Sequence, residues 1–181
     1  ALTRIFIAGT GYFSVLSILK YKWFGEPNGF LDLFFHWDSG WYRSIVQNGY
    51  SYVPDKQSNV VFYPLYPLLV KIFSTIFDHT KAVGFLISNL GLLTGSFYMY
   101  RIVYHETENH NISLLAVFLL LINPMSFFHS IFYAEGIFLG LTTASFYYAL
   151  QNRLLLAGLL GLFATLTRMA GIFTAIPIIL H

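Results

Sequence analysis

Long apolar segments separated by short polar ones dominate the pattern along the chain. A helix that crosses a hydrocarbon core of ~30 Å needs about 20 consecutive, mostly apolar residues. Five segments approach or reach this length and are predicted to be membrane-spanning helices: 5–24, 83–104, 112–131, 132–150 and 154–180. The last segment is longer than a span requires, so we expect it to tilt or to break near Pro177.

Residues 59–77 are also apolar, but their pattern differs from that of a clean span. Pro64 and Pro67 lack backbone donors, and Lys71 falls in the middle of the segment. We predict a re-entrant or interface-lying element. Such backbone is tolerated at membrane depth where it is buried in protein or lines a wet cavity.

Residues 34–48 are predicted to form a helix that lies in the membrane interface. Phe34, Trp37, Trp41 and Ile45 recur at spacings of three or four, which places them on one helix face. The pair Asn48-Gly49 is typical of a helix end.

A cytoplasmic N-terminus would make residues 25–82 one extracytoplasmic loop region with interfacial helices. Asp38, Glu135 and Arg168 would then lie on the same side of the membrane. If residues 59–77 spanned the membrane instead, Glu135 would lie opposite Asp38. The distribution of lysine and arginine does not decide between these topologies.

Composition supports the membrane prediction, because 56% of the 181 residues are hydrophobic and only 10% are charged. A soluble domain has about 25% charged residues. The fold class is therefore predicted to be all-α, a polytopic membrane protein with about five transmembrane helices. Residues 1–181 are expected to be a single domain and a fragment of a longer chain, since the sequence starts at Ala1 and stops within an apolar segment.

The same composition excludes several kinds of site. The chain has no cysteine, which excludes disulfides and thiolate metal ligands. Its histidines show no paired spacing with an acidic partner, so no metal site is predicted. The formal charge of +2 is scattered, and no nucleic-acid partner is expected.

Charged residues within apolar segments are the main candidates for function. A charge near mid-bilayer costs about 2.5–3.5 kcal/mol on insertion scales, so it normally has a partner or a task. Glu135 and Arg168 could form a structural ion pair. Alternatively, Arg168 faces an anionic ligand and Glu135 a sugar or an ordered water. Asp38 could cap a helix, and His36 could be a hydrogen-bonded interface histidine.

Four stretches together resemble a known family: "HWDSGWYRSIVQNGY", "FYPLYPLL", "NPMSFFHSIFYAEGIFLGL" and "GLFATLTRMAG". In order and spacing they are similar to the PIG-V group, the GPI mannosyltransferase 2-like proteins and their bacterial and archaeal relatives. The resemblance extends from about Phe34 to Gly171. It implies the N-terminal part of a GT-C-type membrane glycosyltransferase whose site lies at the extracytoplasmic or lumenal face.

The resemblance also implies substrates and residue roles. The donor would be a polyprenyl-phosphate sugar, typically mannose, and the acceptor a hydroxyl of a glycolipid or glycan. Asp38 matches the acidic residue of the family's first outer loop and would be the general base. Glu135 matches a second acidic position. No metal or other cofactor is required, because a lipid phosphate is already a good leaving group.

Further side chains are candidates for substrate binding on chemical grounds. Arg168, and after it Arg43, would stabilise charge on the departing phosphate. Tyr63 and Tyr66 could contact the sugar, with packing as the alternative role. Trp37 and His36 directly precede Asp38 and are the remaining candidates for substrate binding.

The expected location is a multi-pass position in a prokaryotic plasma membrane, or in the endoplasmic reticulum membrane of a eukaryote. The eukaryotic relatives suggest a membrane partner subunit. Two other classes stay open: a transporter or flippase of a lipid-linked substrate, and a non-catalytic membrane scaffold. In a scaffold, Asp38 would be a helix cap and Glu135–Arg168 a structural pair.

Overall fold

The computed structural model describes residue 31 and residues 34–180. Within this part the chain is helical and contains no strand, which confirms the all-α prediction there. The α-helices are α2 (Ser39–Asn48), α3 (Leu65–Phe77), α4 (Thr80–Thr107), α5 (His110–Ile122), α6 (Glu135–Leu150), α7 (Leu154–Thr165) and α8 (Ala175–Ile179). The short 3₁₀ helices are η2 (Asn59–Val61), η3 (Pro124–His129) and η4 (Met169–Thr174).

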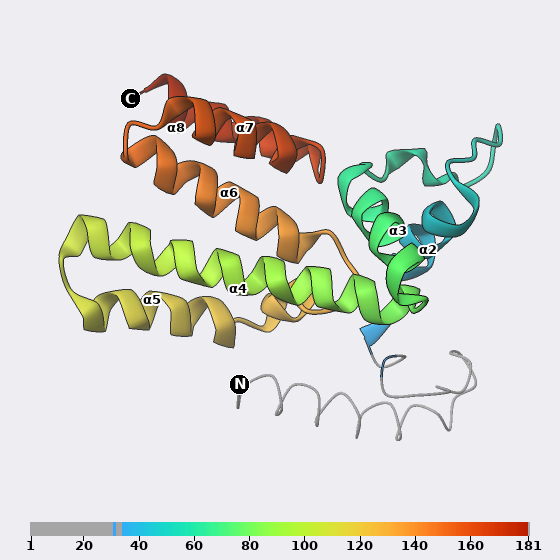
Figure 1. The fold of residues 1–181 in the computed structure, drawn as a ribbon, viewed down its shortest axis with the longest axis horizontal. Helices are drawn as coiled ribbons and strands as arrows, with labels where there is room; N and C mark the ends of the chain where they lie inside the picture. The colour runs from blue at the N-terminus through green and yellow to red at the C-terminus, as the bar shows by residue number, and fades with distance from the viewer. Residues whose placement is uncertain (1–30, 32–33, 181) are drawn as a thin grey trace.

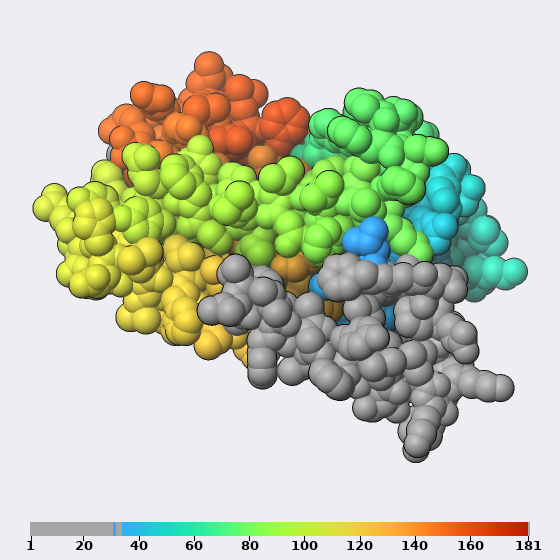
Figure 2. Space-filling model, turned by 60° about the horizontal axis from the view of Figure 1, so that its bottom comes forward, coloured from blue at the N-terminus to red at the C-terminus, as the bar shows by residue number. Residues whose placement is uncertain are grey.

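The helices α4, α5, α6 and α7 lie side by side, and α2 and α3 pack at the end where α6 begins (Figure 1). From another side, the residues of α2 and α3 again gather at one end of the molecule, beside the start of α4 (Figure 2). α4 and α6 run in the same direction, because Gly84 lies against Phe132 and Gly95 against Leu139. The beginnings of α4 and α6 therefore lie at the same end.

Small residues allow α4 and α6 to touch through their backbones. A Cβ atom added to Gly91 would lie 2.4 Å from the backbone of Gly136, and one added to Gly140 would lie 2.8 Å from the carbonyl oxygen of Gly91. Such glycine contacts are typical of helix pairs that pack within membranes. This contact sets the position of α6 against α4.

The helix α4 contains the predicted span 83–104. It has 28 residues and is the one helix in the described part that is long and apolar enough to cross a membrane by itself. The predicted span 132–150 corresponds to α6, which begins at Glu135 and has 16 residues. The predicted span 5–24 lies outside the described residues. The predicted number of five spans is therefore not confirmed.

Two predicted spans are wrong as continuous helices. The segment 112–131 breaks after Ile122, where the side chain of Asn123 accepts a hydrogen bond from the amide of Met125 and Pro124 begins η3. The segment 154–180 breaks after Thr165, well before Pro177. The backbone at Arg168 is extended, with φ −156° and ψ 144°, because the chain turns there between α7 and η4.

Residues 59–77 contain a regular helix rather than irregular backbone throughout. α3 has 13 residues, and at 1.5 Å per residue it measures about 20 Å, too short to cross the hydrocarbon core. Pro64 is the N-cap residue and Pro67 lies in the first turn. Backbone donors in a first turn have no partner within the helix, so the two prolines break no helical hydrogen bond.

The predicted interfacial helix is shorter than expected. It was predicted to begin at Phe34, but α2 begins at Ser39, so Phe34 and Trp37 precede it. Gly49 ends α2 with φ 79°, a conformation that glycine adopts readily, and the predicted helix end is confirmed.

Aromatic side chains form the core where α2, α3 and the segment before α6 meet. The ring centroids of Tyr42 and Tyr66 are 5.0 Å apart, and those of Tyr66 and Phe132 are 5.6 Å apart. Residues 131–134 are buried within this cluster. A rigid aromatic core therefore supports the residues on either side of Glu135 and Asp38.

Candidate active site at the start of α6

Three hydrogen bonds connect segments that are far apart in the sequence. The amide of Phe132 donates to the carbonyl of Phe34 at 3.1 Å. The amide of Asp38 donates to the hydroxyl of Tyr133 at 2.8 Å. The amide of Leu65, at the start of α3, donates to the carbonyl of Leu166 at 2.9 Å. These bonds bring Asp38, the start of α6 and the turn before Arg168 to one end of the helices.

Asp38 is exposed and occupies the N-cap position of α2. Its side chain makes no capping hydrogen bond, although its backbone carbonyl accepts from the amides of Trp41 and Tyr42 at 3.0 and 3.2 Å. The alternative that this carboxylate serves as a helix cap is therefore wrong. The residue before it, Trp37, has φ 49°, a left-handed conformation that costs about 1–3 kcal/mol for a bulky residue.

Glu135 and Arg168 form an ion pair between Oε1 and Nη1. The pair is not sealed in the core, because 44% of the Arg168 side chain and 22% of the Glu135 side chain are exposed. The guanidinium of Arg168 also lies over the ring of Phe138, 5.9 Å from its centroid. The second oxygen of Glu135, Oε2, is buried and has no hydrogen-bond partner among the described residues.

The hydroxyl of Tyr42 lies within electrostatic reach of all three charged groups. Burial is the main cause that raises the pKa of Tyr42 above its ordinary value. The charges of Glu135 and Asp38 raise this pKa further, and Arg168 lowers it. The structure therefore gathers the three residues that the sequence singled out around one buried tyrosine.

Tyr133 is bonded to the amide of Asp38 and lies two residues before Glu135. Burial raises the pKa of Tyr133 to about 12, the hydrogen bond from the Asp38 amide lowers it, and the charges of Asp38 and Glu135 raise it. The phenol is therefore neutral at physiological pH. A second polar group near Asp38 is Ser39, which is fully buried and whose Oγ has no hydrogen-bond partner among the described residues.

Three further candidates near Asp38 in the sequence have other neighbours. The guanidinium of Arg43 lies over the ring of Phe35, 5.7 Å from its centroid. Trp37 is exposed, and its ring lies 5.8 Å from the ring of His36. His36 is half-buried, and its backbone carbonyl accepts from the amide of Ser39.

The two tyrosines around the start of α3 differ in exposure. Tyr66 is fully buried, and its hydroxyl donates to the carbonyl of Gly84 at 3.1 Å. Packing, the alternative role considered for it, is what this position indicates. Tyr63 is half-buried and precedes Pro64 directly.

Sequence reasoning did not single out Tyr42 or Tyr133 as site residues. Both lie within the quoted stretches, and Tyr133 stands two residues before Glu135. Their positions depend on contacts between α2, α3 and the start of α6, which spacing along the chain does not reveal. Only their place beside Asp38 and Glu135 could have indicated them.

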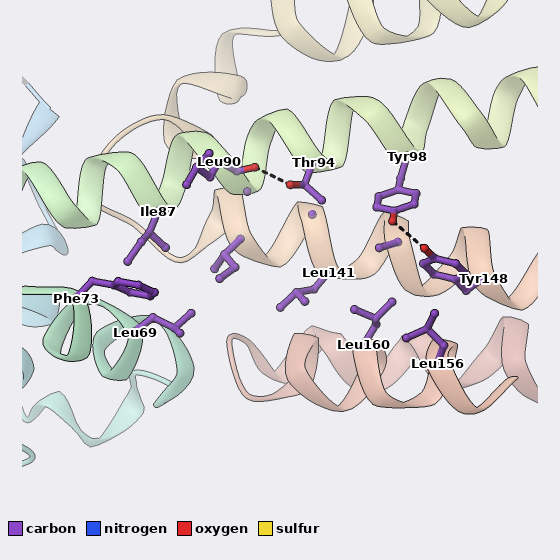
Figure 3. A pocket seen from close by; sticks show the side chains of 14 residues that line it. Leu69, Phe73, Ile87, Leu90, Thr94, Tyr98, Leu141, Tyr148, Leu156 and Leu160 are labelled. Carbon is purple, nitrogen blue, oxygen red and sulfur yellow. Dashed lines mark hydrogen bonds between the residues drawn. The ribbon is translucent and has the colours of Figure 1, made fainter. Parts of the chain in front are cut away.

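A cavity of about 480 Å³ lies elsewhere, between α3, α4, α6 and α7 (Figure 3). Its lining is mostly apolar, with Leu69, Leu141 and Leu160 from three of these helices. The hydroxyls of Tyr98 and Tyr148 meet at one end, 3.1 Å apart. Asp38, Glu135 and Arg168 are not among its lining residues, so the charged cluster is a separate feature.

The chain is similar to GPI mannosyltransferase 2 of Drosophila pseudoobscura pseudoobscura, with 26% identity over 113 residues. The match covers 57% of this chain and 24% of that protein, so it spans about a quarter of the relative's length. No family model matches the chain, and no solved structure matches it. The comparison indicates a distant relationship to a mannosyltransferase.

Proposed function

We propose that the chain is part of a membrane glycosyltransferase. It moves a hexose from a polyprenyl-phosphate donor to an acceptor hydroxyl at the extracytoplasmic face. The family resemblance and the distant relative both favour mannose as this hexose. One observation carries this proposal: the amide of Asp38 is hydrogen-bonded to Tyr133, two residues before Glu135, and Glu135 is paired with Arg168, so three distant segments meet at one end of the helices. The exposed carboxylate of Asp38 and the partly exposed guanidinium of Arg168 are the groups that such a transfer requires.

Asp38 acts as the general base. The acceptor oxygen attacks the anomeric carbon of the donor, and its proton passes to the Asp38 carboxylate. The bond between the anomeric carbon and the phosphate oxygen breaks, and the lipid phosphate leaves with the electron pair. A carboxylate that is free of capping contacts suits this role, and general base catalysis typically contributes 10²–10⁴-fold.

Arg168 stabilises the charge that develops on the departing phosphate. A cation fixed in advance at this position favours the transition state without having to reorganise. Glu135 was expected as a second acidic catalytic residue, but its ion pair with Arg168 gives it a different task in this proposal. It orients the guanidinium through Oε1, and the buried Oε2 is an acceptor without a partner among the described residues.

The membrane location follows from the substrate and from the helices. The isoprenoid chain of the donor stays in lipid, so the reacting phosphate is confined to the membrane interface. α4 is long enough to span the membrane, and the charged cluster lies at the end where α4 and α6 begin. We propose a multi-pass protein with a glycolipid or glycan as acceptor, acting with a membrane partner subunit as its eukaryotic resemblance suggests.

The substitution Asp38→Asn tests the proposal. It removes the base but no capping hydrogen bond, so the protein should remain folded in the membrane. Transfer of mannose from polyprenyl-phosphate mannose should fall by about 10²–10⁴-fold. The matched control is Asp55→Asn, the same chemical change at another exposed position with φ 60°, which should keep full activity.

Two results would overturn this function. One is an Asp38→Asn protein that transfers sugar at the wild-type rate. The other is a wild-type protein that moves a lipid-linked sugar across vesicles without transferring it, as a flippase would.

A further inference from the structure

We propose that Tyr133 is a positioning residue that holds Asp38 in the orientation needed for catalysis. This inference rests on the proposed function, because it concerns the same base. It adds a residue whose contribution acts through Asp38 rather than on the substrate. The observation behind it is a hydrogen bond between two residues 95 positions apart, from the amide of Asp38 to the hydroxyl of Tyr133 at 2.8 Å.

The bond acts on the peptide that carries Asp38. Asp38 precedes the first residue of α2, so its amide has no place in the helical hydrogen-bond pattern. The preceding residue, Trp37, is in the left-handed conformation, which is unfavourable for a bulky side chain. The hydrogen bond from the Asp38 amide to the Tyr133 hydroxyl stabilises this turn. The conformation of the turn sets the direction of the Asp38 carboxylate.

Tyr133 is itself held firmly enough to act as a support. Ser88 of α4 donates through Oγ to the carbonyl of Tyr133 at 2.8 Å. Asn89, also of α4, donates through Nδ2 to the carbonyl of Ser130 at 2.9 Å. Only 5% of Tyr133 is exposed. The backbone that carries the Tyr133 ring is thus held by α4.

The location of Tyr133 also links the two parts of the proposed site. It lies two residues before Glu135, which is paired with Arg168. A shift of the segment that carries Tyr133 would therefore move both the base and the residue that orients the guanidinium. The phenol is neutral at physiological pH, so it holds the Asp38 amide as a hydrogen-bond acceptor without adding charge.

The substitution Tyr133→Phe removes the hydroxyl and keeps the ring. Its matched control is Tyr147→Phe in α6, the same change at another buried tyrosine, whose hydroxyl accepts a hydrogen bond from Arg101. Both proteins lose one buried hydrogen-bonding group, so both lose some stability. Only Tyr133→Phe should lower kcat, by about 10- to 100-fold, with little change in the KM for the donor.

A double substitution separates positioning from general weakening of the fold. If Tyr133 acts through Asp38, Tyr133→Phe should not lower the residual rate of an Asp38→Asn protein any further. If Tyr133→Phe does not accumulate in the membrane, Ser88→Ala replaces it, since it frees the carbonyl of Tyr133. Ser88→Ala should lower kcat in the wild-type protein and leave it unchanged in the Asp38→Asn protein.

The outcomes distinguish this inference from the proposed function. A kcat within twofold of wild type for Tyr133→Phe, or for Ser88→Ala where it replaces that variant, overturns the role of Tyr133. An equal fractional loss in the wild-type and Asp38→Asn backgrounds overturns it too. In these cases a large loss for Asp38→Asn alone would leave the proposed function standing. Full activity of Asp38→Asn would instead contradict the function itself.

Discussion

Replacement of Gly91 by alanine tests the close contact between α4 and α6. A Cβ atom at this position would lie 2.4 Å from the backbone carbon of Gly136 and from the backbone nitrogen of Ile137. Ordinary contacts begin at 3.4 Å, so the added methyl group is about 1.0 Å too close. The atoms that it meets are backbone atoms, and no side-chain rotation can relieve the overlap.

The expected cost follows from two opposing effects. Overpacking typically costs about 1–3 kcal/mol, and contact with backbone places this case at the upper end. Alanine favours a helix over glycine by up to about 1 kcal/mol. The net loss should be about 2 kcal/mol, which corresponds to an unfolding equilibrium shifted by roughly 30-fold.

Unfolding of the purified protein in mixed micelles, followed by circular dichroism during titration with a denaturing detergent, measures this loss. Gly158→Ala in α7 is the matched control, because no described atom beyond the neighbouring backbone of its own helix lies within 4 Å of its added Cβ. That protein should be as stable as wild type or slightly more so. Equal stability of the Gly91→Ala and Gly158→Ala proteins would refute the close approach of the two helices.

Two more substitutions probe the site and the loop beside it. Arg168→Lys keeps the charge but loses the planar guanidinium, so the rate of sugar transfer should fall by at least about 10-fold. Its control is Arg153→Lys, at the far end of α6, which should leave this rate unchanged. Wild-type activity in Arg168→Lys would argue against a directional role for the guanidinium. Asn59→Ala removes the hydrogen bonds of Asn59 to the amide of Ser51 and the carbonyl of Gly49, so trypsin should cleave faster after the exposed Lys56. Asn48→Ala, at the exposed end of α2, is its control, and equal cleavage of the two proteins would contradict this role of Asn59.

The sequence was most informative where local signals and packing agreed. The apolar run 83–104 has no strong breaker, and it lies within α4, Thr80–Thr107. The run 112–131 contains Asn123-Pro124, a stop that hydropathy alone did not reveal. The break near Arg168 has a tertiary cause, because the carbonyl of Leu166 is bonded to the amide of Leu65 in α3. A local Asn-Pro signal therefore explains one wrongly predicted helix end, and a contact between distant segments explains the other.

The candidate site shows the same difference between what local signals reveal and what distant contacts determine. The cost of charges in apolar segments indicated Glu135 and Arg168, and the structure pairs them. Neither spacing nor composition could show that the amide of Asp38 meets Tyr133, since that contact requires α2 and α6 to be placed first. The charged residues of the site could be predicted from the sequence. The neutral residue Tyr133, which is hydrogen-bonded to Asp38, could not.

The central claim is that Asp38 and Arg168 lie at one face of the membrane, and labelling of single cysteines tests it directly. The chain contains no cysteine, so Asp38→Cys, Arg168→Cys and Asn152→Cys each introduce one reactive site. Asn152 follows α6, which runs beside the spanning helix α4 in the same direction, so it marks the end of the helices opposite to Asp38 and Arg168. In intact cells, a membrane-impermeant maleimide should label the cysteines at positions 38 and 168 and spare the one at 152. Labelling of position 38 or 168 without the other would contradict a shared site.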